Sequence, residues 1–101
     1  MKTVYLDGAV ITEMADVHRA FAAALDLPVW YGANLDALYD MLTSCMEETV
    51  VLIANRPQLI ETLGGKSFAL LHMLRDAMEE NPRLRVAEKW AYGKEEENEE
   101  K

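Results

Sequence analysis

Cysteine and basic residues are scarce in this sequence, and long apolar runs are absent; each shortage excludes a class of protein. The one cysteine, Cys45, cannot form an intramolecular disulfide, so the chain is not typical of a small secreted domain held together by disulfide bonds. No apolar run approaches the roughly 20 residues of a membrane-spanning helix. The first residues, MKTVYLDGAV, lack the apolar segment of a signal peptide. We therefore expect a reduced, cytoplasmic protein outside the membrane.

The charge of the chain is strongly negative. Ten Lys and Arg stand against 18 Asp and Glu, which gives a formal net charge of −8. Proteins that bind nucleic acids contact phosphates through clusters of Lys and Arg, so direct binding to RNA or DNA is not expected. No basic residue lies between Arg19 and Arg56, whereas five acidic residues do. One side of the fold should therefore carry a negative field, with contributions from Asp26, Asp36, Asp40, Glu47 and Glu48.

Length and composition predict one domain followed by a short tail. The chain has 101 residues, half of them hydrophobic, which suits a single domain with its own core. We assign residues 1–92 to this domain and residues 93–101 to an acidic tail that we predict to be disordered. Neither a metal nor a cofactor is expected. His18 and His72 have no second ligand at metal-site spacing, and LGGKS lacks the first glycine of a phosphate-binding loop.

Strand patterns alternate with helix patterns along the chain. Because helical connections join neighbouring parallel strands, this order predicts an α/β fold with a three-stranded parallel sheet and about four helices. The apolar run TVVLIA is typical of a central strand covered on both faces. In the last helix, Phe68, Leu71, Leu74 and Met78 mark the expected buried face. The expected strands are 3–7, 49–54 and 83–90, and the expected helices are 13–25, 35–43, 56–63 and 67–80.

The short helix predicted over residues 35–43 has two different sides. Asn34 is a good N-cap for it, and Leu35, Leu38 and Leu42 form the expected buried stripe. The other side is expected to be an exposed stripe. Its two carboxylates lie one turn apart, where like charges repel each other. An ordinary solvated face would explain such a stripe, but Trp30 and Tyr31 in the adjoining loop favour a protein interface. The exposed stripe consists of Asp36, Tyr39, Asp40 and Thr43.

The stretch LPVWYGANLDALYDML resembles the signature of the barstar family, the intracellular inhibitors of barnase-type bacterial ribonucleases. The succession of strands and helices agrees with that family over roughly residues 2–90. The resemblance implies that the second helix and the loop before it close the ribonuclease active site, with acidic side chains in place of RNA phosphates. It makes Asp40 the main phosphate mimic, Asp36 its partner and Asp76 a further charge. The other contact residues that we expect are Trp30, Gly32, Asn34, Leu35, Tyr39 and Thr43.

Two alternatives stay open beside the inhibitor. The chain would be a binding module with the same fold and acidic face for another cationic protein. More remotely, Asp36 and Asp40 would act as an acid and base or hold a divalent cation, although no nucleophile or third ligand accompanies them. For the inhibitor we expect no enzymatic activity, and a monomer that forms a 1:1 complex with a basic, barnase-like ribonuclease.

Overall fold

The computed structural model describes residues 1–89, so the predicted acidic tail and the end of the predicted domain lie outside the described residues. Within residues 1–89 it has the three strands and four helices that the sequence predicts. No helix in this part of the chain is long and apolar enough to span a membrane. The elements are β1 (Lys2–Asp7), α1 (Met14–Leu25), α2 (Leu35–Thr43), β2 (Thr49–Ala54), α3 (Arg56–Leu63), α4 (Gly65–Glu80) and β3 (Leu84–Lys89).

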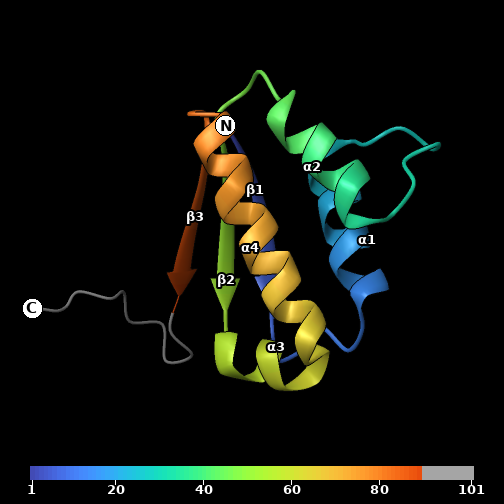
Figure 1. Cartoon of the computed structure of the whole chain (residues 1–101), viewed down its shortest axis with the longest axis vertical. Coiled ribbons are helices and arrows are strands. Elements are labelled where there is room, and N and C mark those ends of the chain that lie inside the picture. The colour runs from blue at the N-terminus through green and yellow to red at the C-terminus, as the bar shows by residue number, and fades with distance from the viewer. Residues whose placement is uncertain (90–101) are drawn as a thin grey trace, which may run out of the picture.

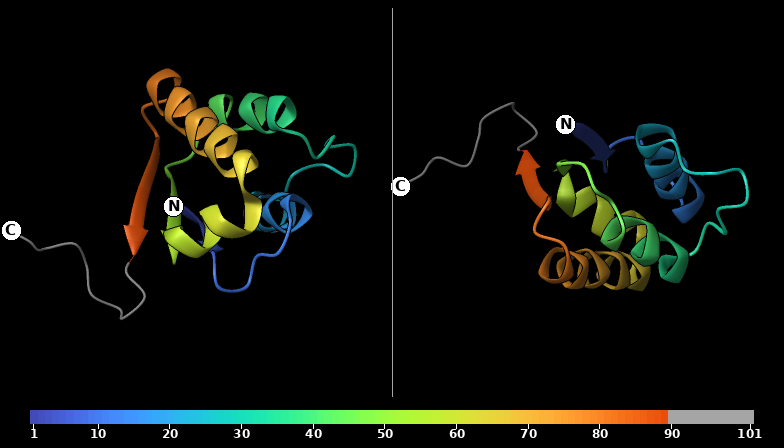
Figure 2. Two further views of the ribbon diagram at one scale, coloured as in Figure 1. Left: turned by 60° about the horizontal axis from the view of Figure 1, so that its bottom comes forward. Right: turned by 90° about the horizontal axis from the view of Figure 1, so that it is seen from above.

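The three strands form a parallel sheet in the order β1-β2-β3, as Figure 1 shows. Val4, Val51 and Val86 stand side by side across it. Both crossovers step in the same direction along the sheet. Because such crossovers are almost always right-handed, they place their helices on the same face. The views in Figure 2 show the helices gathered on one side of the strands, with α1 beside β1 and α4 beside β3.

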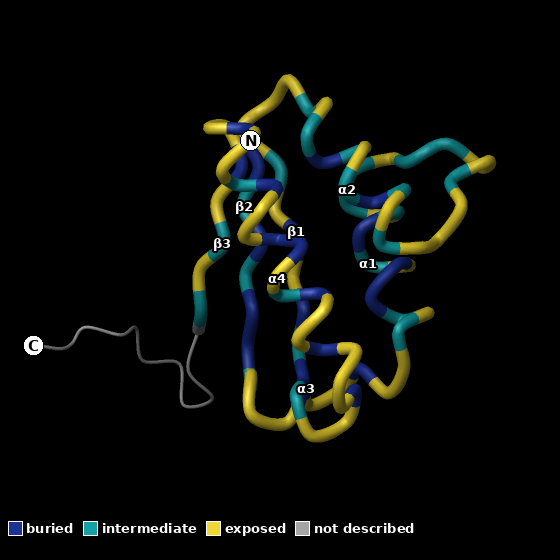
Figure 3. Tube along the Cα trace, in the orientation of Figure 1, coloured by how far each residue is buried: buried dark blue, intermediate teal, exposed yellow. Residues whose placement is uncertain are grey.

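Burial along the strands alternates between the two faces of the sheet. Val4 and Leu6 are fully buried, whereas Tyr5 between them is 49% exposed. In β2, Val50 and Leu52 are only half-buried, and their alternate positions lie on the face away from the helices. Figure 3 colours the Cα trace by burial. The prediction that this central strand is covered on both faces is therefore wrong for the described residues. An apolar run alone does not distinguish a two-layer from a three-layer arrangement.

The buried face of α4 also differs from the prediction. The helix begins at Gly65 rather than at Ser67, directly after Gly64 (φ 61°) ends α3. Phe68 is 60% exposed. The helix packs against α2, α3 and β3. Of the predicted residues, Leu74 is buried, and Leu71 and Met78 are half-buried against the core, so the prediction is wrong for Phe68. The fully buried residues of α4 are Ser67, Leu70, Met73, Leu74 and Ala77.

Candidate functional site

Helix α2 forms where the sequence predicts it. The Asn34 side-chain oxygen accepts a hydrogen bond of 2.8 Å from the backbone N–H of Ala37, which confirms the predicted N-cap. Leu38 and Leu42 are fully buried, and Leu35 is half-buried. A helix of nine residues has little stability on its own, so this packing holds α2 in place.

The outward side of α2 carries two exposed carboxylates. Asp36 lies in the first turn, where the helix dipole favours a negative charge, but Asp40 lies one turn further along. Their mutual repulsion costs a few tenths of a kcal/mol. Within residues 1–89 neither carboxylate takes part in an ion pair. Both negative charges are therefore available to a cationic partner.

Tyr39 and Thr43 are half-buried, which corrects the prediction of one fully exposed stripe. Tyr39 packs against the core, and the Thr43 hydroxyl donates a 2.9 Å hydrogen bond to the Tyr39 carbonyl oxygen. The cause is α4, which lies alongside α2 and covers this flank. Burial raises the pKa of the Tyr39 phenol. Four nearby negative charges raise it further, from Glu80, Asp76, Asp40 and Glu79.

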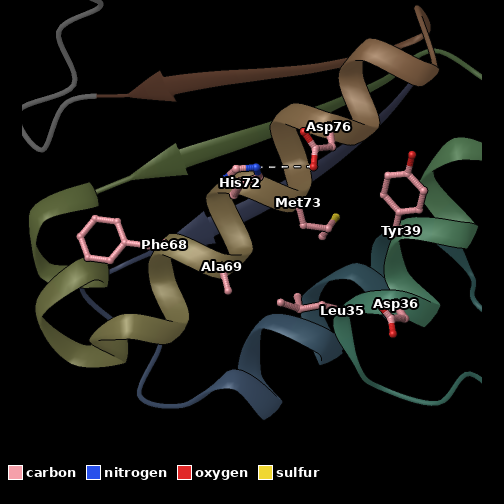
Figure 4. A pocket seen from close by; sticks show the side chains of 8 residues that line it. All are labelled: Leu35, Asp36, Tyr39, Phe68, Ala69, His72, Met73 and Asp76. Atoms are coloured by element: carbon pink, nitrogen blue, oxygen red, sulfur yellow. Dashed lines mark ion pairs between the residues drawn. The ribbon is translucent and has the colours of Figure 1, made fainter.

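A groove of about 530 Å³ lies on the surface where α2 and α4 pack together (Figure 4). It brings Asp36 and Tyr39 of α2 together with Asp76 of α4, so acidic groups far apart in the sequence share one surface. His72 Nε2 lies 3.6 Å from the Asp76 carboxylate, and both side chains are exposed. The groove thus combines apolar walls with acidic groups. Its lining residues are Leu35, Asp36, Tyr39, Phe68, Ala69, His72, Met73 and Asp76.

The loop before α2 presents an aromatic side chain to solvent. Trp30 is 73% exposed, and Gly32 is also at the surface. A Cβ added to Gly32 would lie only 3.1 Å from Asn34 Nδ2. Ala33 adopts a left-handed backbone conformation with φ 51°, which a residue with a Cβ adopts at a cost. Trp30 and Gly32 therefore lie in one exposed segment that leads directly into the cap of α2.

Tyr31 and His18 fix this loop to α1. Tyr31 is half-buried, and its phenol oxygen lies 2.5 Å from His18 Nδ1. His18 is only 7% exposed. The sequence interpretation gave His18 no role beyond structure. Its partner is 13 residues away in the chain, so no local pattern joins the two residues.

Asn81 fixes the other end of α2. It is 4% exposed, and its side-chain amide donates hydrogen bonds of 2.8 Å to Leu42 O and 3.0 Å to Cys45 O. The sequence interpretation missed this residue, and it missed the contribution of Glu79 and Glu80 to the negative surface. The glutamates had a signal, because they follow Asp76 at helical spacing. The contact of Asn81 had no signal in the sequence, because its partners lie 36 and 39 residues away.

These features define a small two-layer α/β protein with an acidic helix and loop on its surface. The family model described as Barstar (barnase inhibitor) matches residues 1–96 of the chain. The chain therefore belongs to the barstar family, which confirms the resemblance noted in the sequence. It is also similar to the "Putative ribonuclease inhibitor YrdF" of Bacillus subtilis (strain 168). The two are 31% identical over 81 residues, which cover 79% of this chain and 89% of that protein.

Proposed function

We propose that this protein inhibits a barnase-type ribonuclease by inserting α2 and the preceding loop into the active site of the enzyme. The observation that carries the proposal is the group of exposed carboxylates that α2 and α4 present together. Asp36 and Asp40 have no ion-pair partner within residues 1–89, and Asp76 joins them across the groove. Membership of the barstar family supports a ribonuclease as the partner.

The electrostatics of the two surfaces are complementary. A ribonuclease must hold phosphates and stabilise a negatively charged transition state, so its active site is cationic. Carboxylates in a preformed arrangement replace those phosphates without any substrate to cleave. Binding also relieves the repulsion between Asp36 and Asp40, because cations then lie beside both side chains. Attraction between the two fields speeds association and makes it sensitive to salt.

Each residue of the proposed interface has a distinct role. Asp40 is the principal phosphate mimic, Asp36 its neighbour, and Asp76 the third charge. Trp30 and Tyr39 are the aromatic anchors beside them. Gly32, Asn34, Leu35 and Thr43 shape the backbone and the edge of the contact surface. In this proposal the protein is a monomeric, non-enzymatic inhibitor without a cofactor, and it forms a 1:1 complex in the cytoplasm.

Calorimetric titration into a catalytically inactive barnase-type ribonuclease tests the proposal. We expect 1:1 binding by the full chain, and a loss of affinity of at least about 30-fold for Asp40→Asn, since truncating one member of a desolvated charge pair costs about 2 kcal/mol or more. Close charge pairs between barnase and barstar themselves couple by about 1.5–7 kcal/mol. Glu61→Gln removes the same charge from an exposed position on α3 and should change the affinity less than about 2-fold.

Equal losses for Asp40→Asn and Glu61→Gln would contradict the proposed interface, because only the net charge would then matter. If the wild-type chain binds no barnase-type ribonuclease, the inhibitor proposal fails. A different basic protein whose binding depends on Asp36 and Asp40 would then identify the chain as a binding module of the same fold.

A further inference from the structure

The hydrogen bonds of the loop before α2 are few. Within the described part of the chain, Tyr31 N–H donates to Pro28 O at 2.9 Å, and Asn34 Nδ2 donates weakly to Gly32 O at 3.4 Å. Both of these bonds stay inside the loop or its cap. Among the described residues, the hydrogen bond that connects residues 28–33 to α1 joins Tyr31 to His18. The centroids of the two rings are 5.7 Å apart. This contact is therefore the polar link between the loop and α1.

We infer that His18 is a positioning residue that holds the partner-binding loop in its binding conformation through the phenol of Tyr31. The inference rests on the proposed function, because it concerns how the inhibitory surface is kept ready. It assigns His18 no contact with the partner. Its effect reaches the partner only through Tyr31 and the exposed residues next to it in the loop, above all Trp30.

The contact joins the Tyr31 hydroxyl to His18 Nδ1, and its donor depends on the position of the imidazole proton. With that proton on Nε2, the Tyr31 hydroxyl donates to Nδ1. Burial lowers the pKa of His18 and raises the pKa of Tyr31 to about 12, so both groups are neutral at pH 7.5. The charged residue lining the same depression is Arg19, which is paired with Asp16. Protonated His18 has an N–H at Nδ1 and can only donate to the phenol oxygen, and it places a positive charge on a side chain that is 7% exposed, which favours conformations that bring the ring into water.

Loss of the link should loosen the loop without unfolding the domain. The loop backbone includes Ala33 in a left-handed conformation, and Trp30 has little contact with the rest of the molecule because it is 73% exposed. Without the hydrogen bond to His18, Tyr31 keeps only its packing against the core, and these loop residues sample other conformations more often. The partner must then order them during binding, and the complex dissociates faster.

Two variants separate the hydrogen bond from its surroundings. Tyr31→Phe removes only the phenol oxygen. His18→Asn places an amide oxygen near the position of Nδ1 and does not titrate. Tyr5→Phe is the matched control, because it removes a phenol oxygen from the open face of the sheet. The measurements are the hydrogen-exchange protection factors of loop amides 29–35 in the free protein and the dissociation rate from the inactive ribonuclease, at pH 7.5 and 5.0.

At pH 7.5 we expect Tyr31→Phe to lower loop protection and to raise the dissociation rate by about 3- to 10-fold, the worth of one hydrogen bond. Tyr5→Phe should change neither quantity. The wild type should lose loop protection between pH 7.5 and 5.0, whereas His18→Asn keeps the same protection at both pH values. Unchanged loop protection in Tyr31→Phe would overturn the inference. If the wild type binds no ribonuclease, the proposed function fails, and the exchange data on the free protein still decide whether His18 holds the loop.

Discussion

The two sides of α2 have opposite characters although they belong to the same nine-residue helix. The outward side carries Asp36 and Asp40, which repel each other and have no ion-pair partner among residues 1–89. The inward side carries Leu38 and Leu42, which are fully buried. Under the proposed function, stability and recognition are therefore separated on one helix. The unfavourable charge pair is tolerated because packing on the opposite side provides much more free energy than the repulsion costs.

The largest expected effect on stability comes from the inward side of α2. Leu42→Ala removes a fully buried side chain from the core and should lower the free energy of unfolding by about 2–5 kcal/mol. Urea denaturation measures this loss. Among molecules that stay folded, the affinity for the inactive ribonuclease should change only a few-fold. A large loss of affinity with unchanged stability would show that the inward side takes part in recognition after all.

Asn81→Ala tests how far the end of α2 depends on α4. The substitution removes the amide donor from the buried Leu42 O and the part-buried Cys45 O, although Leu42 O keeps a 3.4 Å hydrogen bond from the Cys45 backbone N–H. Each of these hydrogen bonds contributes about 0.5–1.5 kcal/mol, so we expect a decrease of about 1–3 kcal/mol in the free energy of unfolding, measured by thermal or urea denaturation. Asn55→Gly is a useful control, because it removes a part-buried amide contact to Asp7 at the opposite end of β2 and leaves the left-handed backbone of residue 55 without strain. Hydrogen exchange of the α2 amides separates the two variants. If both variants lower the protection of these amides equally, Asn81 has no special role at the end of α2.

The pH dependence of stability should show two acidic steps of different origin. The pKa of His18 is lowered by burial, so the unfolded chain binds a proton more readily, and stability falls as the pH drops below about 6.5. Hydrogen bonds from Thr12 and the nearby Arg19 lower the pKa of Asp16 to about 2. Its stabilising contribution is complete above the ordinary value of 3.8 and is lost as the pH falls through about 2.

Thermal unfolding between pH 8 and pH 2 measures both steps. His18→Asn should remove the first step and leave the second, whereas Asp16→Asn should do the reverse. A first step that persists in His18→Asn would assign it to another group.

The smallest expected effect on stability comes from the outward side of α2. Replacing both carboxylates in Asp36→Asn/Asp40→Asn removes their repulsion and should raise the free energy of unfolding by a few tenths of a kcal/mol, less at high salt. The same variant should lose most of its affinity for the ribonuclease. Denaturation at low and high salt together with titration measures the two quantities. A marked loss of stability would mean that the carboxylates stabilise the fold, which would end the separation of the two sides.

Local features of this protein could be predicted from its sequence, whereas contacts between distant segments could not. The bounds of α2 and its Asn34 cap follow from neighbouring residues, and the structure has both. The exposed position of Phe68 and the half-buried positions of Tyr39 and Thr43 depend on how α4 packs against α2, which helical periodicity does not determine.

The cluster of carboxylates at the candidate site could be predicted from the sequence only in part. Charge distribution predicted a negative side, but the meeting of Asp36 and Asp76 followed from the family resemblance and not from spacing. The contacts of His18 and Asn81 could not be predicted, because each side chain bonds to a residue in a distant segment. Long-range contacts of this kind have no periodic signature in the chain.

The groove between α2 and α4 has a consequence for how much inhibitor a cell contains. Its two walls come from residues 35–39 and 68–76, so neither segment presents the surface alone. An isolated peptide copied from α2 would lack Asp76, the walls and the fixed ends, and the unfolded chain would lack all of them. Under the proposed function, the effective dose of inhibitor equals the number of folded molecules. A loss of about 1–2 kcal/mol in folding stability would leave most molecules folded at equilibrium, but it would raise the unfolded fraction that proteases remove and so lower the amount of inhibitor.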